Sequence, residues 1–189
     1  MRILNSDELK IEKNKIIESI VDGAVFIYPT DTIYGIGCNA QISKSVKKVR
    51  RLKGRAANPF SVIAPSVDWI KENCLIAEEA EERIDKLPGP YTLILKLKNP
   101  KCVAKEINPG LQTLGVRIPS HWISKLVAEA GVPVVTTSVN RSNEDYMTSI
   151  EDLDSAVKKG VDFALYEGAK EGRPSRIVDL TEKAKVIER

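Results

Sequence analysis

Helical and extended sequence patterns alternate along this chain, and that alternation restricts the possible folds more than any single motif does. Apolar residues at helical spacing predict helices over residues 14–22, 43–52, 78–87 and 120–130. Extended apolar or alternating runs predict strands over residues 24–28, 61–64, 91–97, 114–118, 132–138, 162–166 and 176–180. Such a series predicts an α/β or α+β sheet with helices packed on it, in a single domain over residues 1–189. The pattern leaves the order of the strands open.

The composition narrows the class of protein. With 189 residues, 42% of them hydrophobic, and a net charge of +3, the chain is expected to be an ordinary soluble domain with a sizeable core. No apolar stretch approaches the roughly 20 residues of a membrane span, and the first residues lack a signal-peptide core, so we expect a cytoplasmic protein with no membrane partner. The three cysteines are widely spaced, and the single histidine, His121, is expected at the surface. We therefore predict neither a histidine-dependent triad nor a metal site.

A cluster of polar residues directly follows the first predicted buried strand. Pro29, which donates no ladder hydrogen bond, ends that strand, and Thr30, Asp31 and Thr32 come next. Because ligands of open α/β sheets bind beyond the carboxyl ends of strands, these side chains are candidates for a binding site. The Gly-Ile-Gly segment at residues 35–37 is expected to let the backbone turn or approach a ligand closely.

A dense basic cluster covers residues 44–55. Four of its side chains fall opposite the apolar stripe of the predicted helix and are expected to form a solvated face: Lys44, Lys47, Lys48 and Arg51. Lys53 and Arg55 differ because they flank a glycine at the helix end, where an ammonium and a guanidinium can together hold a triphosphate. We expect both side chains in a solvated cavity, with Asn58 in the same loop. RNA binding through the whole basic stretch is the alternative, and it lacks the interleaved aromatic residues that such binding uses.

Three further polar clusters lie at predicted strand ends. Arg117 lies in an otherwise apolar strand, and a buried arginine needs an anion, either a structural carboxylate or a substrate. Thr136, Ser138 and Asn140 leave a buried strand at a period of two and therefore share one face. Ser175 stands at the entrance of the last predicted strand. Each cluster alone is a weak signal, because such residues are common in turns. Together with the cluster after the first strand and the Lys53/Arg55 loop, they form a pattern that ordinary turn structure explains poorly.

Five segments, PTDTIYGIGC, KGRAANPF, TLGVRIP, TTSVN and PSRIVDL, taken in this order, resemble the YrdC/YciO-like family of L-threonylcarbamoyladenylate synthases. The resemblance implies an open, twisted, mixed α/β sheet with flanking helices around a central cavity, in the short single-domain form. It implies a nucleotidyltransferase that makes threonylcarbamoyl-AMP and pyrophosphate from L-threonine, bicarbonate and ATP, with Mg²⁺ accompanying the ATP. The product would feed the t6A modification of tRNA through a separate threonylcarbamoyl transferase complex, and tRNA itself is a further candidate partner.

The resemblance also implies roles for individual residues. The catalytic positions of the family fall on Lys53 and Arg55. The ATP-binding positions fall on Lys53, Arg55, Asn58, Thr113, Ser138, Asn140 and Arg189. The threonine-binding positions fall on Thr32, Arg117, Thr136 and Ser175, with Arg117 holding the carboxylate as a bidentate donor. The resemblance implies no metal ligand on the protein itself.

Two features depart from the pattern of the larger relatives. Ile63 stands where they have a histidine in the threonine pocket, which predicts weaker discrimination of threonine from serine. The stretch at residues 59–61, Pro-Phe-Ser, resembles the YciO branch. Two alternatives therefore stay open: a YciO-like paralogue that acts on a related adenylate, and an RNA-binding module.

Overall fold

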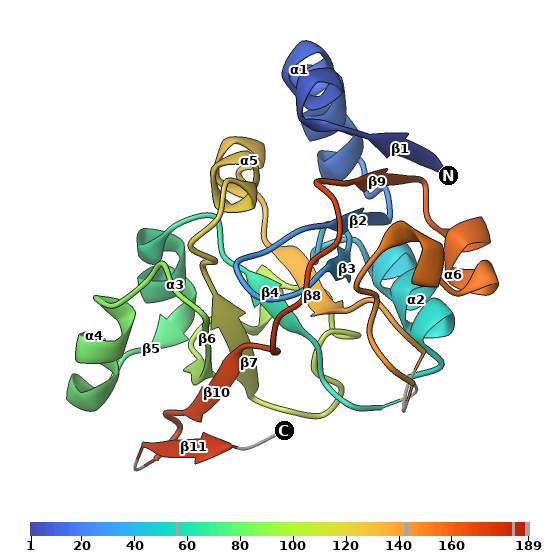
Figure 1. Ribbon diagram of the computed structural model, residues 1–189. Coiled ribbons are helices and arrows are strands. Elements are labelled where there is room, and N and C mark those ends of the chain that lie inside the picture. The colour runs from blue at the N-terminus through green and yellow to red at the C-terminus, as the bar shows by residue number, and fades with distance from the viewer. Residues whose placement is uncertain (56, 142–143, 183, 188–189) are drawn as a thin grey trace.

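The computed structural model describes residues 1–55, 57–141, 144–182 and 184–187 (Figure 1). Its helices are α1 (Ser6–Val21), α2 (Ser43–Lys53), α3 (Val67–Asn73), α4 (Glu78–Ile84), α5 (Ile123–Ala130) and α6 (Ser155–Gly160), with short 3₁₀ helices η1 (Pro100–Cys102) and η2 (Ile150–Asp152). Its strands are β1 (Arg2–Leu4), β2 (Phe26–Tyr28), β3 (Gly35–Gly37), β4 (Ser61–Ile63), β5 (Cys74–Leu75), β6 (Tyr91–Leu97), β7 (Thr113–Arg117), β8 (Val134–Ser138), β9 (Phe163–Leu165), β10 (Arg176–Asp179) and β11 (Lys185–Ile187).

The strands form one mixed sheet in the order β1-β9-β2-β3-β8-β4-β7-β6-β10-β11, and β5 pairs with β6 off this path. Pairing is parallel for β1–β9, β9–β2, β4–β7 and β6–β10, and antiparallel for the other neighbours. Strands β1 and β11 lie far apart at the two ends of this order (Figure 1), so the sheet is open. The predicted fold class, an open mixed α/β sheet with flanking helices, is confirmed.

Two apolar cores hold the helices on the sheet. One core joins α1 and α5 to the sheet through residues such as Ile16, Ile20 and Leu126. The other, larger core receives Val46 from α2 and Val157 from α6, together with side chains of α3 and α4. Burial of these apolar stripes is the main force that stabilises short helices of this kind, because helices of such length are marginal alone.

Helix boundaries differ from the prediction where polar residues make up a helical turn. The helix predicted over residues 14–22 begins eight residues earlier, at Ser6. Asn5 caps it by accepting hydrogen bonds from the backbone N–H groups of Asp7 and Glu8 at 2.9 and 3.0 Å, and the Glu8 carboxylate accepts one from the backbone N–H of Asn5 at 2.9 Å. This capping box stabilises turns that have few apolar residues to bury. The helix predicted over residues 120–130 begins only at Ile123.

The Gly-Ile-Gly segment at residues 35–37 is strand β3, not a turn. A Cβ atom at Gly37 would collide with the carbonyl oxygen of Val135, and one at Gly35 would lie 2.9 Å from the ring of Tyr28. The glycines therefore allow β3 to lie tightly against its neighbours. Val135 and Tyr28 are the protein groups that approach these glycines closely.

The helices and the cysteines bear on the expectations about a membrane span and about disulfides. None of the helices in the described part of the chain has both the length and the apolar character needed to cross a membrane. Cys38, Cys74 and Cys102 are buried and form no disulfide. Burial raises the pKa of the Cys38 and Cys74 thiols to about 12, so neither is an activated nucleophile.

Candidate active site

The polar strand ends gather around one cavity, called here the hydroxyl cavity. Strand register explains the gathering, because Ser61 of β4 lies opposite Thr136 of β8 on one side and opposite Gly115 of β7 on the other. The lining residues are Thr30, Thr32, Ile33, Tyr34, Gly35, Ser61, Thr92, Arg117, Thr136, Thr137, Ser138 and Ser175. Most of them carry hydroxyl groups, so the cavity suits a small polar ligand.

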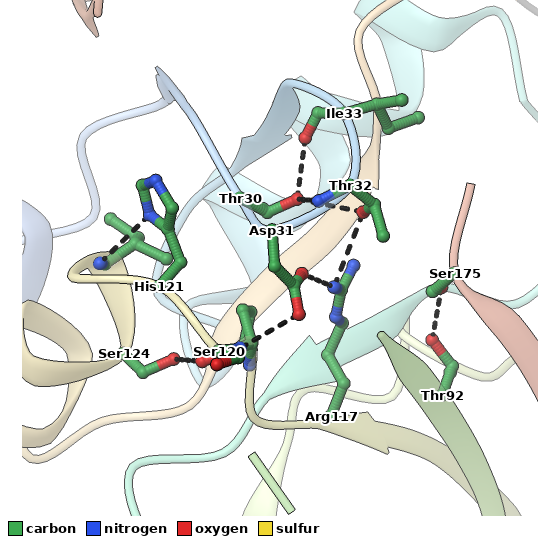
Figure 2. Close-up of polar contacts among 12 residues, drawn as sticks. Thr30, Asp31, Thr32, Ile33, Thr92, Arg117, Ser120, His121, Ser124 and Ser175 are labelled. Carbon is green, nitrogen blue, oxygen red and sulfur yellow. Dashed lines mark hydrogen bonds and ion pairs between the residues drawn. The ribbon is translucent and has the colours of Figure 1, made fainter. Parts of the chain in front are cut away.

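Arg117 supplies a positive charge to the hydroxyl cavity, and Asp31 is the carboxylate that pairs with it (Figure 2). The Nη2 atom of Arg117 lies 2.5 Å from Oδ1 of Asp31, and the two side chains are only 6% and 10% exposed. The other carboxylate oxygen of Asp31 accepts a hydrogen bond from the backbone N–H of Ser120 at 2.9 Å. The prediction that this arginine is buried and needs an anion is confirmed. A guanidinium presents several donors in a fixed fork, so Arg117 can hold Asp31 and a substrate carboxylate together.

Local hydrogen bonds fix the hydroxyls of the loop between β2 and β3 (Figure 2). The Thr30 hydroxyl donates to the carbonyl of Ile33 at 2.7 Å and accepts from the backbone N–H of Thr32 at 3.1 Å. The Thr32 hydroxyl oxygen lies 3.0 Å from that of Thr30 and 3.5 Å from Nη2 of Arg117. Such turns hold the loop in one conformation, so Thr32 is presented beside Arg117.

Two larger cavities, of about 290 and 330 Å³, adjoin the hydroxyl cavity. Both are lined by Arg55, Pro59, Phe60, Ser61 and Ile177, and Ser61 also lines the hydroxyl cavity. Thr113 lines the first of the two, and Ser138 and Tyr146 line the second. Their size, their apolar walls and the Arg55 guanidinium suit a nucleotide with its phosphates.

Arg50, which sequence reasoning missed, holds the loop that carries Arg55 and Asn58. Its guanidinium donates to the carbonyl oxygens of Arg55 and Asn58 at 3.1 and 3.2 Å, and to those of residues 106–107 at 2.7 and 3.3 Å. It also lies 4.5 Å from the ring centroid of Phe60. Burial lowers the pKa of Arg50. The sequence signal that could have identified Arg50 as a buried residue is its position four residues after Val46, on the same face of α2.

Lys53 does not lie in a solvated cavity, so that expectation was wrong. Its side chain is buried, with 3% of the residue exposed. Its ammonium group donates to the backbone carbonyl of Ser138 at 2.7 Å and to the side-chain oxygen of Asn140. Burial, assisted by the charge of Arg55, lowers the pKa of Lys53 to about 7. Lys53 therefore ties the end of α2 to the segment that leaves β8.

The structure brings together most, but not all, of the residues predicted for the site. The hydroxyl cavity holds all four threonine-binding candidates, which are Thr32, Arg117, Thr136 and Ser175. Among the ATP-binding candidates, Arg55 and Thr113 line the larger cavities, Ser138 lines one of them as well as the hydroxyl cavity, and Asn140 contacts Lys53. The Asn58 side chain is exposed, and Arg189 lies outside the described residues. These positions leave the individual roles as predictions.

The position of Ile63 was expected in the threonine pocket, but Ile63 does not line the hydroxyl cavity. It is fully buried in the core that also holds Tyr28 and Val134. The side chain at this position therefore contributes to packing, and the polar partners of a ligand in the cavity must come from other residues.

His121 is half-buried, not at the surface. Its Nε2 atom lies 3.1 Å from the Glu167 carboxylate, which also accepts a hydrogen bond from the Trp122 indole N–H at 2.9 Å. Burial lowers the pKa of His121 more than Glu167 raises it. These bonds anchor the start of the segment that leads to Ser175.

The basic face of α2 is solvated, as predicted. Lys44, Lys47 and Arg51 are exposed, and two of the four lysines and arginines of this face are already paired, Lys47 with Glu106 at 3.3 Å and Lys48 with Asp162 at 3.0 Å. These ion pairs neutralise part of the charge that RNA binding would require.

A known family matches nearly the whole chain. Residues 18–189 match the model of the Sua5/YciO/YrdC family, which carries the description telomere recombination. This chain belongs to that family. A protein of Methanocaldococcus jannaschii is 36% identical over 189 residues, which cover 97% of this chain and 87% of that protein. The name of that relative, threonylcarbamoyl-AMP synthase, is provisional.

Two solved structures share the fold. Sua5 of P. abyssi, complexed with L-threonine, matches with a TM-score of 0.83 and 29% identity, over 96% of this chain and 54% of that chain. YciO of E. coli matches with a TM-score of 0.84 over 98% and 93% of the two chains, but its 23% identity shows the fold alone. This chain thus spans about half the length of the Sua5 chain.

Proposed function

We propose that this chain is an L-threonylcarbamoyl-AMP synthase, which forms threonylcarbamoyl-AMP and pyrophosphate from L-threonine, bicarbonate and ATP for the t6A modification of tRNA. The observation that carries the proposal is the buried Arg117 in a small hydroxyl-lined cavity that adjoins two larger cavities lined by Arg55. Family membership, the named synthase of M. jannaschii and the threonine complex of P. abyssi Sua5 support it.

The chemistry requires positioning and charge neutralisation more than a protein nucleophile. The ammonium group of threonine loses a proton, and the resulting amine adds to CO2 derived from bicarbonate and gives a carbamate. From the ammonium form and bicarbonate, the step releases one water and one proton overall. A carbamate oxygen then attacks the α-phosphorus of ATP, the bond to the bridging oxygen breaks, and pyrophosphate leaves. An attack of this kind is accelerated by holding the two reactants in line and by donors aimed at the phosphate oxygens.

The residues divide these tasks between the cavities. Arg117 would hold the threonine carboxylate, and the hydroxyls around it would line the amino-acid site. Arg55 would neutralise the phosphates from the adjoining cavities. Lys53 would act as a positioning residue, because its ammonium holds Ser138 and Asn140 in place at the boundary of the two sites.

Mg²⁺ would enter as part of the ATP substrate. The described ranges contain no group of three or more His, Cys, Asp or Glu side chains placed to hold a metal ion. A magnesium ion bridging the phosphate oxygens would add positive charge where the attacking oxygen and the leaving pyrophosphate share negative charge. Its ligands would then be mainly phosphate oxygens and water, which Mg²⁺ prefers in nucleotide sites.

A panel assay tests the proposal. The purified chain is incubated with ATP, bicarbonate and each amino acid in turn, and pyrophosphate release is measured. We expect release that depends on threonine and bicarbonate together. Turnover without any amino acid would favour a YciO-like activity on another adenylate. Salt-dependent tRNA affinity that is lost when Lys44 and Arg51 are neutralised, in the absence of pyrophosphate release, would favour the RNA-binding module.

A further inference from the structure

The inference in this subsection rests on the proposed function, in which threonine is the substrate. To discriminate threonine from valine, the site needs a polar partner for the substrate hydroxyl. The two amino acids have nearly the same shape, so an apolar pocket cannot separate them strongly, whereas a site built to hydrogen-bond a hydroxyl can. Ile63, at the position where larger relatives have a histidine, is buried in the core and cannot be that partner. Another group in the hydroxyl cavity must supply it.

Thr92 and Ser175 form a buried hydroxyl pair in the hydroxyl cavity. Their oxygen atoms lie 2.8 Å apart, and the residues are 2% and 6% exposed. Figure 2 shows the two side chains pointing toward each other to the right of Arg117, with Asp31 to its left. The pair joins β6 to the residue that precedes β10, at positions 83 residues apart in sequence.

Strand register places the Thr92–Ser175 pair beside Arg117, which would hold the substrate carboxylate. Strands β6 and β7 are antiparallel, and Leu93 of β6 lies opposite Val116 of β7. One residue further along this register, Thr92 therefore lies opposite Arg117. Thr92 also lies opposite Ile177 of β10, which brings Ser175 close. In threonine, only two carbon atoms separate the carboxylate from the hydroxyl oxygen. Groups that read both must therefore be neighbours, as Arg117 and this pair are.

The hydrogen-bonding capacity of the pair matches a substrate hydroxyl. Two hydroxyls have two donors and four acceptor lone pairs, and the bond between them uses one of each. Within the described residues, neither Thr92 nor Ser175 makes another side-chain hydrogen bond, so one donor and several lone pairs face the cavity. Two of the other lining hydroxyls already donate within the protein, Thr30 to a backbone carbonyl and Ser138 to Asn140.

A glycine keeps the space beside the pair open. Gly115 of β7 lines one of the larger cavities together with Thr92, and a Cβ atom there would collide with the Ser61 hydroxyl and lie 3.4 Å from the Thr92 methyl group. Any larger residue at position 115 would therefore displace the Ser61 hydroxyl. Ser61 and Thr92 line both the hydroxyl cavity and this larger cavity, so a change at position 115 would affect both.

We propose that Thr92, paired with Ser175, is a specificity-determining residue that binds the side-chain hydroxyl of the threonine substrate. Valine would leave the buried pair without a partner at that position, and serine would keep the partner. Leaving a buried polar group without its partner lowers affinity by about 10- to 100-fold.

Equilibrium binding tests the inference without relying on turnover. The wild-type chain and three variants, Thr92→Val, Thr92→Ser and the control Thr148→Val, are titrated by calorimetry with threonine and with valine. Thr148 lines none of the three cavities and carries a hydroxyl bonded to Asp152. Circular dichroism and the melting temperature of each variant show that it is folded.

We expect wild type to bind threonine at least tenfold more tightly than valine. Thr92→Val should lose about 10- to 100-fold in threonine affinity while its valine affinity changes less than threefold. Thr92→Ser and Thr148→Val should behave like wild type. Equal loss for both amino acids, an unchanged threonine affinity in Thr92→Val, or a wild type that prefers neither amino acid would overturn the inference. Selective threonine binding without pyrophosphate release would instead refute the proposed function alone.

Discussion

Replacing Asp31 with asparagine should destabilise the fold much more than removing an exposed carboxylate does. Asp31 and Arg117 form an ion pair whose side chains are 10% and 6% exposed, and the second Asp31 oxygen accepts the N–H of Ser120. In Asp31→Asn the charge facing Arg117 disappears, and an amide NH2 group replaces one of the two accepting oxygens. Breaking one side of a buried ion pair costs about 3–5 kcal/mol, and the oxygen that remains places this variant near 3 kcal/mol.

The magnitude can be read from unfolding curves. For a chain of this size each kcal/mol shifts the melting temperature by roughly 2–4 °C, so about 3 kcal/mol corresponds to roughly 6–12 °C. Urea titrations followed by tryptophan fluorescence give the free energy of unfolding directly. The matched control is Glu129→Gln, which breaks the exposed pair with Lys13, whose two side chains are each 44% exposed. That variant should lose less than about 1 kcal/mol. Asp31→Asn within 1 kcal/mol of wild type would refute the reasoning.

Three further predictions concern the two arginines and Lys53. Arg117→Lys should raise the KM for threonine more than tenfold and leave the KM for ATP unchanged, because a point charge cannot replace a bidentate fork; equal changes in both would contradict the assignment. Arg55→Ala should lower kcat/KM for ATP by about 30- to 1,000-fold, the equivalent of about 2–4 kcal/mol for a lost charged donor, whereas the control Lys47→Ala on the solvated face should do little; normal turnover of Arg55→Ala would exclude the phosphate role. Burial lowers the pKa of Lys53 from 10.5 to about 7 in the folded chain. Between pH 7 and pH 10.5 the unfolded chain therefore binds a proton that the folded chain lacks, so the free energy of unfolding rises with pH. The free energy of unfolding of Lys53→Met relative to wild type should therefore fall between pH 7 and 9 in urea titrations, and a difference independent of pH would contradict the lowered pKa.

Local pattern predicts the secondary structure well where one face of an element is buried. The strand Tyr91–Leu97 has the bounds that its alternating pattern predicted, because every second side chain faces the core. The first turns of α1 were missed because a capping box, not an apolar stripe, stabilises them. Strand β3 was missed because Gly35 and Gly37 have low strand propensity, and only the tight packing against Tyr28 and Val135 explains their use.

Prediction of the candidate site from the sequence was also limited, because its contacts join residues that lie far apart in the chain. The family resemblance implied that Thr32, Arg117, Thr136 and Ser175 share one site, and all four line the hydroxyl cavity. The partners within the site were not predictable, because Asp31 lies 86 residues from Arg117 and Thr92 lies 83 residues from Ser175. Nothing in a local pattern specifies such pairs before the strand order is known.

The most direct test of the central claim is whether carbon from bicarbonate enters an adenylate. The purified chain is incubated with ATP, magnesium, threonine and ¹³C-labelled bicarbonate, and the nucleotide products are analysed by mass spectrometry. The proposed function predicts threonylcarbamoyl-AMP that is heavier by one labelled carbon, in an amount equal to the pyrophosphate released. Replacing threonine with valine at the same subsaturating concentration should reduce the yield of labelled adenylate at least tenfold. Pyrophosphate release with an adenylate that carries no label, or with no amino acid, would contradict the claim.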